Sequence, residues 1–277
     1  MSEEPRHQNE YGSRQVEAAR RALVDLGQVL AVFHDCLVVV GGWVPDLLIP
    51  DATEAHVGSI DVDLALDAEK LQDGRYAELL KLLFDTRRYR PGAKTFQFLT
   101  DIDLGDGNEP VQVEVEFLAP KDVKLESNNP KLTPNFRVLQ ADGCGSAFND
   151  PVEIEFAGQS ARGATNIVRL RVASLPDFLV MKALALAGRD KPKDAYDICY
   201  CLNNFPGGLE ALAAAWKGRI QEPDVVRAVK ILRDKFATLG AFGPWHVVEF
   251  LDPPDRTAQE MEARRAFELV QALLNLL

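Results

Sequence analysis

The spacing of hydrophobic and polar residues changes about two thirds of the way along the 277-residue chain. Before residue 173, short β-branched or alternating runs predict strands at 36–40, 59–66, 95–99, 111–118, 152–156 and 167–172. Helical spacing in the same part predicts helices at 14–33, 43–49 and 68–84. From residue 174 the pattern is helical, with helices predicted at 174–187, from 190, and at 207–217, 222–236 and 257–276. The chain therefore predicts an α/β (α+β) fold, in which a mixed-sheet domain precedes a C-terminal helical domain.

The predicted organisation has three parts. Residues 1–13 are polar and are predicted to form a flexible tail. Residues 14–173 form the predicted α/β domain, and 174–277 the predicted helical domain. Within the first domain, 119–150 is rich in Pro, Asn, Lys, Asp and Gly, which predicts a long loop or an insertion.

Composition and charge limit the classes of function. Hydrophobic residues make up 47% of the chain and charged residues 26%, which is ordinary for a globular protein. The net charge of −11 argues against a general nucleic-acid coat protein or a polybasic membrane binder, because both need net positive faces. No apolar run approaches the ~18 residues of a membrane helix, and the polar N-terminus does not resemble a signal peptide. We therefore expect no membrane partner.

The four cysteines lie in runs that predict buried free thiols: Cys36, Cys144, Cys199 and Cys201. They form no CxxC pair, and the four histidines form no HExxH motif, so zinc and disulfide roles are not expected. Free thiols indicate a reducing compartment, and we expect the cytoplasm.

The stretch 38–66 carries the most specific chemistry. An apolar strand ends in Gly41-Gly42, a short helix follows, and Asp61 and Asp63 stand in the next strand, where alternation puts them on one face. Two carboxylates there are costly unless a cation neutralises them, and Mg²⁺ binds to one or two carboxylates plus substrate phosphates. A glycine pair lets the backbone approach a phosphate closely. Taken singly, the glycines also fit a tight turn and the aspartates a solvated strand edge.

A third acid would complete a two-metal site. Residues 111–118 place Glu114 and Glu116 on one face of a strand, with apolar residues on the other. Two metal ions need shared and unshared carboxylates from neighbouring strands, and either glutamate can serve. An exposed sheet face is the alternative for each of them.

These residues resemble the nucleotidyltransferase fold of the DNA polymerase β type, which combines Gly-Gly, a spacer and a Ser/Thr-x-Asp-x-Asp strand. The finer resemblance is to AbiEii/AbiGii-type and MenT-like nucleotidyltransferases, the toxin halves of certain toxin–antitoxin pairs. It rests on GGWVPDLL…GSIDVDLAL and MKALALAGRDKPKDAYDICYCL and covers about 36–118 and 165–205. The spacer from Gly42 to Asp61 is longer than in many members, and the third acid is Glu rather than the commoner Asp.

The resemblance implies roles for individual residues. The triphosphate would be held by Gly41, Gly42 and Ser59. Metal, as Mg²⁺ or Mn²⁺, would be held by Asp61, Asp63 and Glu116, which matches the family's third acid better than Glu114 does. Lys182 would contact the nucleotide phosphates, and the last motif would consist of Lys193, Asp194 and Asp197. The residues expected to carry catalysis are Asp61, Asp63, Glu116, Lys182 and Asp194.

Basic residues gather close to this last motif. Between Ser160 and Lys193 there are seven basic residues and two acidic ones, in a chain that is acidic as a whole. Lys182 stands within an apolar helix, where a lysine either extends to solvent or meets an anion. Lys193, Asp194 and Asp197 share one helix face, for which a plain i,i+4 surface pair is the alternative explanation. A second basic cluster either lines the acceptor side or forms a solvated loop: Arg87, Arg88, Arg90 and Lys94.

The sequence therefore predicts an enzyme, a metal-dependent nucleotidyltransferase that moves a nucleoside monophosphate from an NTP to an acceptor hydroxyl. The relatives suggest a tRNA 3′ end or a protein as acceptor, and an antitoxin as a further partner. One alternative is a small-molecule nucleotidyltransferase of the antibiotic-modifying type. Another is a non-catalytic nucleotidyltransferase-like binding or regulatory protein, which would have no need of paired metal carboxylates.

Overall fold

The computed structural model describes residues 5–72, 74–121, 123 and 138–277. They divide into two compact units. The sheet unit consists of Gly12–Val44 and Gly58–Ser174. The helical unit consists of Met1–Tyr11, as far as it is described, together with Pro45–Val57 and Leu175–Leu277.

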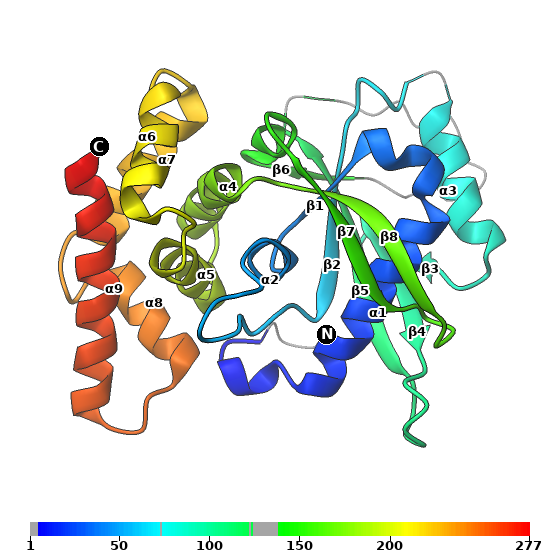
Figure 1. The fold of residues 1–277 in the computed structure, drawn as a ribbon, viewed down its shortest axis with the longest axis horizontal. Coiled ribbons are helices and arrows are strands. Elements are labelled where there is room, and N and C mark those ends of the chain that lie inside the picture. Colours follow the sequence, from blue (N-terminus) through cyan, green and yellow to red (C-terminus); the bar gives the residue numbers. More distant parts are fainter. Residues whose placement is uncertain (1–4, 73, 122, 124–137) are drawn as a thin grey trace. The chain divides into compact units, whose positions relative to one another are not determined.

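Within the described residues, the sheet unit contains one mixed sheet of eight strands (Figure 1). The strands are β1 Leu37–Val40, β2 Asp61–Leu66, β3 Arg90–Pro91, β4 Gln97–Ile102, β5 Val111–Pro120, β6 Leu139–Ala141, β7 Val152–Gln159 and β8 Thr165–Val172. Their order is β3-β4-β5-β2-β1-β8-β7, with β6 pairing β5 off this path. The pairs β1–β8, β2–β5 and β5–β6 are parallel and the others are antiparallel. The predicted α/β class with a mixed sheet is confirmed.

Helix α1, Ser13–Val29, covers one face of this sheet and contacts β5, β7 and β8. Three small side chains on its buried side allow close approach: Ala18, Ala19 and Ala22. Leu64 of β2 lines a cavity together with Leu23 and Leu26 of α1, so it points to the covered face. Because strand side chains alternate, Asp61 and Asp63 point to the opposite face.

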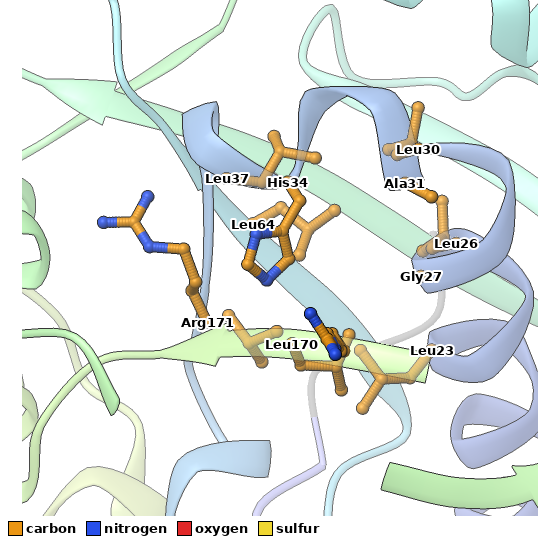
Figure 2. Close-up of a pocket in the computed structure, with 12 residues that line it drawn as sticks. Leu23, Leu26, Gly27, Leu30, Ala31, His34, Leu37, Leu64, Leu170 and Arg171 are labelled. Atoms are coloured by element: carbon orange, nitrogen blue, oxygen red, sulfur yellow. The ribbon is translucent and has the colours of Figure 1, made fainter. Parts of the chain in front are cut away.

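That cavity lies between α1, the sheet and the 3₁₀ helix η2, Ala31–Cys36. Figure 2 shows His34 pointing in among leucine side chains, while the guanidinium of Arg171 points away from them. The side chains that line the described cavity include no carboxylate. It is therefore a packing gap on the covered face and is separate from the acids of β2.

The remaining elements of the sheet unit differ in part from the predictions. Helix α3, Arg75–Asp85, begins later than predicted, and the two-residue strand β3 was not predicted. The predicted insertion 119–150 contains the strand β6 and the 3₁₀ helix η3, Cys144–Phe148. Residues 122 and 124–137 of this insertion lie outside the described residues.

The helical unit contains the helices of the C-terminal part of the chain. They are α4 Leu175–Gly188, α5 Pro192–Asn203, α6 Gly208–Gly218, α7 Pro223–Lys235, α8 Phe242–Leu251 and α9 Arg256–Leu276. The short helix α2, Trp43–Leu48, begins in the sheet unit and ends in the helical unit. Helix α8 was not predicted, because its sequence FGPWHVVEFL has almost no polar positions to define a helical period.

Residues 5–13, which the sequence predicts as part of a flexible tail, are structured. The 3₁₀ helix η1 spans Gln8–Glu10. Arg6 Nε donates to Glu249 Oε1 at 2.7 Å, and the Tyr11 ring lies 5.6 Å from the ring of Phe250. The segment up to Tyr11 is therefore held against α8. Residues 1–4 lie outside the described residues.

All four cysteines are buried free thiols, as predicted. Burial raises the pKa of Cys199 to about 12, which keeps its thiol protonated and unreactive.

Among the helices of the described residues, none combines the length and the apolar character that crossing a bilayer requires.

Candidate functional site

Four carboxylates lie in register on β2 and β5. The two strands pair in parallel, with Asp61 beside Glu114 and Asp63 beside Glu116. Neighbouring strands lie about 4.8 Å apart, and residues in register point to the same face of the sheet. The acids are partly exposed, whereas their apolar neighbours are buried: Val62, Val113, Val115 and Phe117. We call these four acids the acid face.

Gly41 follows β1 directly and lies beside Asp63. Its φ is +70°, a conformation that L side chains rarely adopt, and a Cβ at this position would overlap with the carboxylate of Asp63. Val40 of β1 pairs with Asp63 of β2, which brings the turn and the acid together. The glycine therefore permits the turn and also leaves room for the carboxylate.

Gly41→Ala is expected to lower the free energy of unfolding by about 2–4 kcal/mol, because backbone strain and the collision with Asp63 add together. Gly163→Ala is the matched control: its φ is +76° and a Cβ there meets no atom within 4 Å. In the control only the backbone strain is added, so its free energy of unfolding is expected to fall by about 1–2 kcal/mol. Urea denaturation measures both. Equal losses would show that the Asp63 carboxylate moves aside freely.

Asp61 is positioned by two hydrogen bonds. Ser59 Oγ donates to Asp61 Oδ1, and the indole Nε1 of Trp43 donates to the Asp61 backbone oxygen at 2.7 Å. Both donors are buried. Of the residues predicted to hold the triphosphate, Ser59 thus contacts Asp61, and Gly41 lies beside Asp63.

Both candidates for the third acid lie on the acid face, and each accepts a hydrogen bond from the β3–β4 region. Lys94 Nζ lies 3.0 Å from Glu116 Oε1 and 3.9 Å from Glu114 Oε2. Gln97 Nε2 donates to Glu114 Oε2 at 2.5 Å. Glu116 is in register with Asp63, and its side chain is only 15% exposed.

The second predicted motif forms a buried ion-pair network in the helical unit. Lys182 Nζ of α4 lies 2.8 Å from Asp194 Oδ1 and 2.7 Å from Asp197 Oδ2 of α5. Lys193 Nζ lies 2.7 Å from Asp197 Oδ1, and Arg189 Nε lies 2.7 Å from Asp194 Oδ2. All except Arg189 are buried. The i,i+4 pair of Lys193 and Asp197 is therefore formed, but in the interior and not at the surface.

The network changes the pKa values of its members. Burial alone would lower the pKa of Lys182, but the charges of Asp194 and Asp197 outweigh it and hold this pKa above its ordinary value. Burial would raise the pKa of Asp194, but Lys182 and Arg189 bring it down to about 2. The anion that Lys182 meets within the described chain is thus a pair of aspartates.

His56 belongs to the same network and was missed by the sequence analysis. Its Nε2 lies 2.9 Å from Asp197 Oδ1, and its ring stacks on Tyr196 at 5.5 Å. Burial and the nearby Lys193 lower its pKa, so the ring is neutral and Nε2 carries the proton donated to Asp197. His56 lies in a loop 141 residues before Asp197, and no local sequence pattern predicts a contact over that separation.

The family model described as nucleotidyl transferase AbiEii toxin, type IV TA system, matches residues 26–268, which include the acid face and the α4–α5 network. The chain belongs to the AbiEii nucleotidyltransferase toxin family. It is therefore an enzyme of the nucleotidyltransferase class, as the sequence predicted. Neither the search of curated proteins nor the search of solved structures gives a match.

The acid face of this nucleotidyltransferase has the donor chemistry of a divalent metal site. Carboxylate oxygens on neighbouring strands suit Mg²⁺ and Mn²⁺. Among the described residues, however, no three His, Cys, Asp or Glu side chains converge closely enough to hold an ion. The residue types and the β2–β5 register suit a divalent ion.

A buried thiol lies close to the acid face. Burial, and to a smaller extent the charge of Asp63, raise the pKa of Cys144 to about 12. A thiol with this pKa stays protonated at neutral pH, so Cys144 is neither a nucleophile nor a thiolate ligand here.

Some members of the two basic clusters are paired with carboxylates of the chain. In the cluster 87–94, Arg88 pairs with Asp25, Arg90 with Asp101 and Lys94 with Glu116. In the stretch 160–193, the cations of the α4–α5 network are paired with its aspartates. Cations already paired within the chain release fewer counterions, so these paired members add less to the salt dependence of any RNA binding.

The low pKa of Asp194 predicts a loss of stability in acid. Its pKa is about 2 in the folded chain against an ordinary value of 3.8, so ionised Asp194 stabilises the fold above pH 3.8. This stabilisation is lost as the pH falls from about 4 to about 2. We expect the urea midpoint to fall over this window in the wild-type chain and to fall less in Asp194→Asn. The same slope in both chains would contradict the assignment.

Proposed function

We propose that this nucleotidyltransferase transfers a nucleoside monophosphate from an NTP to an acceptor hydroxyl, with Mg²⁺ or Mn²⁺ held by Asp61, Asp63 and Glu116. The observation that carries the proposal is the register of β2 and β5, which puts these carboxylates side by side next to the Gly41 turn. Membership of the AbiEii family supports the reaction class.

The bound metal would supply a Lewis acid for the triphosphate and would lower the pKa of the attacking hydroxyl. The residues of the chain have separate tasks. Ser59 donates to the carboxylate of Asp61 and the indole of Trp43 to its backbone oxygen, so Ser59 orients the carboxylate before any ligand arrives. Asp63 lies against Gly41, whose missing Cβ leaves the room that the Asp63 carboxylate takes. We assign Gly41, Gly42 and Ser59 to the triphosphate.

Glu116 is the better of the two candidates for the third carboxylate. It is in register with Asp63, whereas Glu114 is in register with Asp61 and accepts from Gln97. Glu116 is also the less exposed of the two, with 15% of its side chain accessible against 40%. A less exposed carboxylate is less well hydrated and depends more on a cation partner.

For the helical unit we propose that Lys182 and Lys193 contribute to binding of the nucleotide phosphates, with Asp194 and Asp197 holding the two ammonium groups in place. The support is the sharing of carboxylates: Asp197 contacts both lysines, and Asp194 contacts Lys182. His56 fixes the remaining side of Asp197. The same residues form the second motif of the family resemblance.

The acceptor that we propose is a tRNA 3′ end or a protein hydroxyl, and the antitoxin of the pair is the proposed regulatory partner. The family description, a toxin of a type IV toxin–antitoxin system, supports the second point. Arg88 and Arg90 are paired with Asp25 and Asp101, which leaves fewer cations for an extended RNA footprint and favours a small acceptor end.

The direct test is incubation of the full chain with each α-³²P-labelled NTP, Mg²⁺, total RNA and a protein extract, followed by separation of RNA, protein and small molecules. We expect label in the RNA or protein fraction, and none when EDTA replaces Mg²⁺. Label confined to the small-molecule fraction would instead favour the antibiotic-type reaction. No label in any fraction, together with no Mg²⁺-dependent NTP binding by calorimetry, would favour a binding module.

A further inference from the structure

The ammonium of Lys94 lies on the part of the acid face where the third carboxylate is found. Its Nζ is 3.0 Å from Glu116 Oε1 and 3.9 Å from Glu114 Oε2. The Lys94 side chain is 47% exposed, and that of Glu116 is 15% exposed. A resident cation of the protein is therefore bound to the carboxylate that the proposed reaction assigns to metal.

The backbone of the β3–β4 connection fixes the position of Lys94. Gly92 N donates to Gln97 O at 2.8 Å, and Gln97 N donates to Lys94 O at 3.3 Å. The ammonium also lies 5.7 Å from the centre of the Phe96 ring, which supports the side chain through a cation–π contact. The turn thus presents Lys94 to β5 without any rearrangement of the sheet.

Occupation of Glu116 by an ammonium has a direct consequence for metal binding. The same oxygen cannot accept from Lys94 and coordinate a divalent ion at full strength, and the two cations repel each other at short range. Among the described residues no three potential ligands converge on one point, although four carboxylates share the face. The oxygen of Glu116 that a metal would use is the one that accepts from Lys94.

We propose that Lys94 competes with the divalent metal for Glu116 and so sets the metal affinity of the acid face. The inference rests on the proposed metal site and goes beyond it by naming the group that metal must displace. Metal alone binds weakly while Lys94 is in place. Once metal holds Glu116, the ammonium is released on its flexible stem and can pair with an anionic group of the substrate.

The test is titration of the full chain with Mn²⁺ alone. The electron paramagnetic resonance signal of free Mn²⁺ measures how much of the ion is bound. Lys94→Met is expected to bind Mn²⁺ about two- to fivefold more tightly than the wild type, which is the range for losing a partly exposed ion pair. Lys94→Arg keeps the charge and is expected to bind as the wild type does. Lys81→Met is the matched control, since it removes another lysine–carboxylate pair, that of Lys81 with Asp85 on α3.

A second comparison ties the effect to Glu116. In a Glu116→Gln background, adding Lys94→Met is expected to give no further gain, because the contested carboxylate is gone. If the wild type binds Mn²⁺ and Lys94→Met binds it no more tightly, the competition is refuted while the proposed function stands. If neither chain binds Mn²⁺, the proposed metal site fails, and the inference fails with it.

Discussion

Asp63→Asn lowers the rate of nucleotidyl transfer by about 10²–10³-fold, the range found when one preorganised electrostatic group is removed from an active site. Asp63 lies between Gly41 and Glu116, at the point where the turn and the two acidic strands meet. The amide keeps the shape of the side chain but removes the charge that would hold the proposed divalent cation. Incorporation of α-³²P label from the preferred NTP measures the rate, and Asp61→Asn is expected to behave in the same way.

The matched control is Asp101→Asn on β4. Asp101 is also a strand aspartate of the sheet unit, but it is exposed and pairs with Arg90. The rate of nucleotidyl transfer by Asp101→Asn is expected to stay within about twofold of the wild type, because surface ion pairs contribute little to stability. Unchanged transfer in both Asp61→Asn and Asp63→Asn would refute the metal assignment.

Lys182→Met is expected to lower the free energy of unfolding by about 3–5 kcal/mol, the usual cost of removing one partner from a buried ion pair. Lys182 is the residue that links Asp194 to Asp197, and both carboxylates have no exposed surface. Without it, Asp197 keeps Lys193 and His56, whereas Asp194 keeps only Arg189 of its partners named above. Urea denaturation followed by circular dichroism at 222 nm measures the loss.

Lys217→Met is the control for Lys182, since Lys217 is an exposed lysine of the same unit. Surface substitutions of this kind change stability by about 0.5 kcal/mol or less. A loss in Lys182→Met no larger than that of the control would mean that the two aspartates do not depend on its charge.

The sequence predicted the acid face better than it predicted the partners of its residues. Alternation around Asp61 and Asp63 was enough to place both on one face, and the same reasoning placed Glu114 and Glu116 together on another strand. Which strands are neighbours is a long-range property, and only the structure gives the register that aligns Asp63 with Glu116. The family resemblance indicated the correct class from local motifs alone, and the family match confirms it.

The misses have separate physical causes. Helix α8 lacks the polar positions that define a period, and β3 is only two residues long. The contact of His56 with Asp197 joins a loop to a distant helix, which no local pattern can show. From the sequence, the Lys182 side chain could either extend to solvent or meet an anion. In the structure it meets Asp194 and Asp197 of the next helix.

The placement of residues 45–57 has a consequence for dissecting this protein. These residues follow Gly41-Gly42 and precede Ser59 in the chain, yet they belong to the helical unit, where Tyr200 Oη donates to Glu54 O at 2.9 Å. Cutting the polypeptide once near residue 174 would leave this segment attached to the sheet fragment without its partners on α5. The two units therefore cannot be separated by one cut into fragments that each keep their own contacts. Shuffling of whole units between relatives would have to carry the N-terminal segment up to Tyr11, the short segment and the C-terminal helices together.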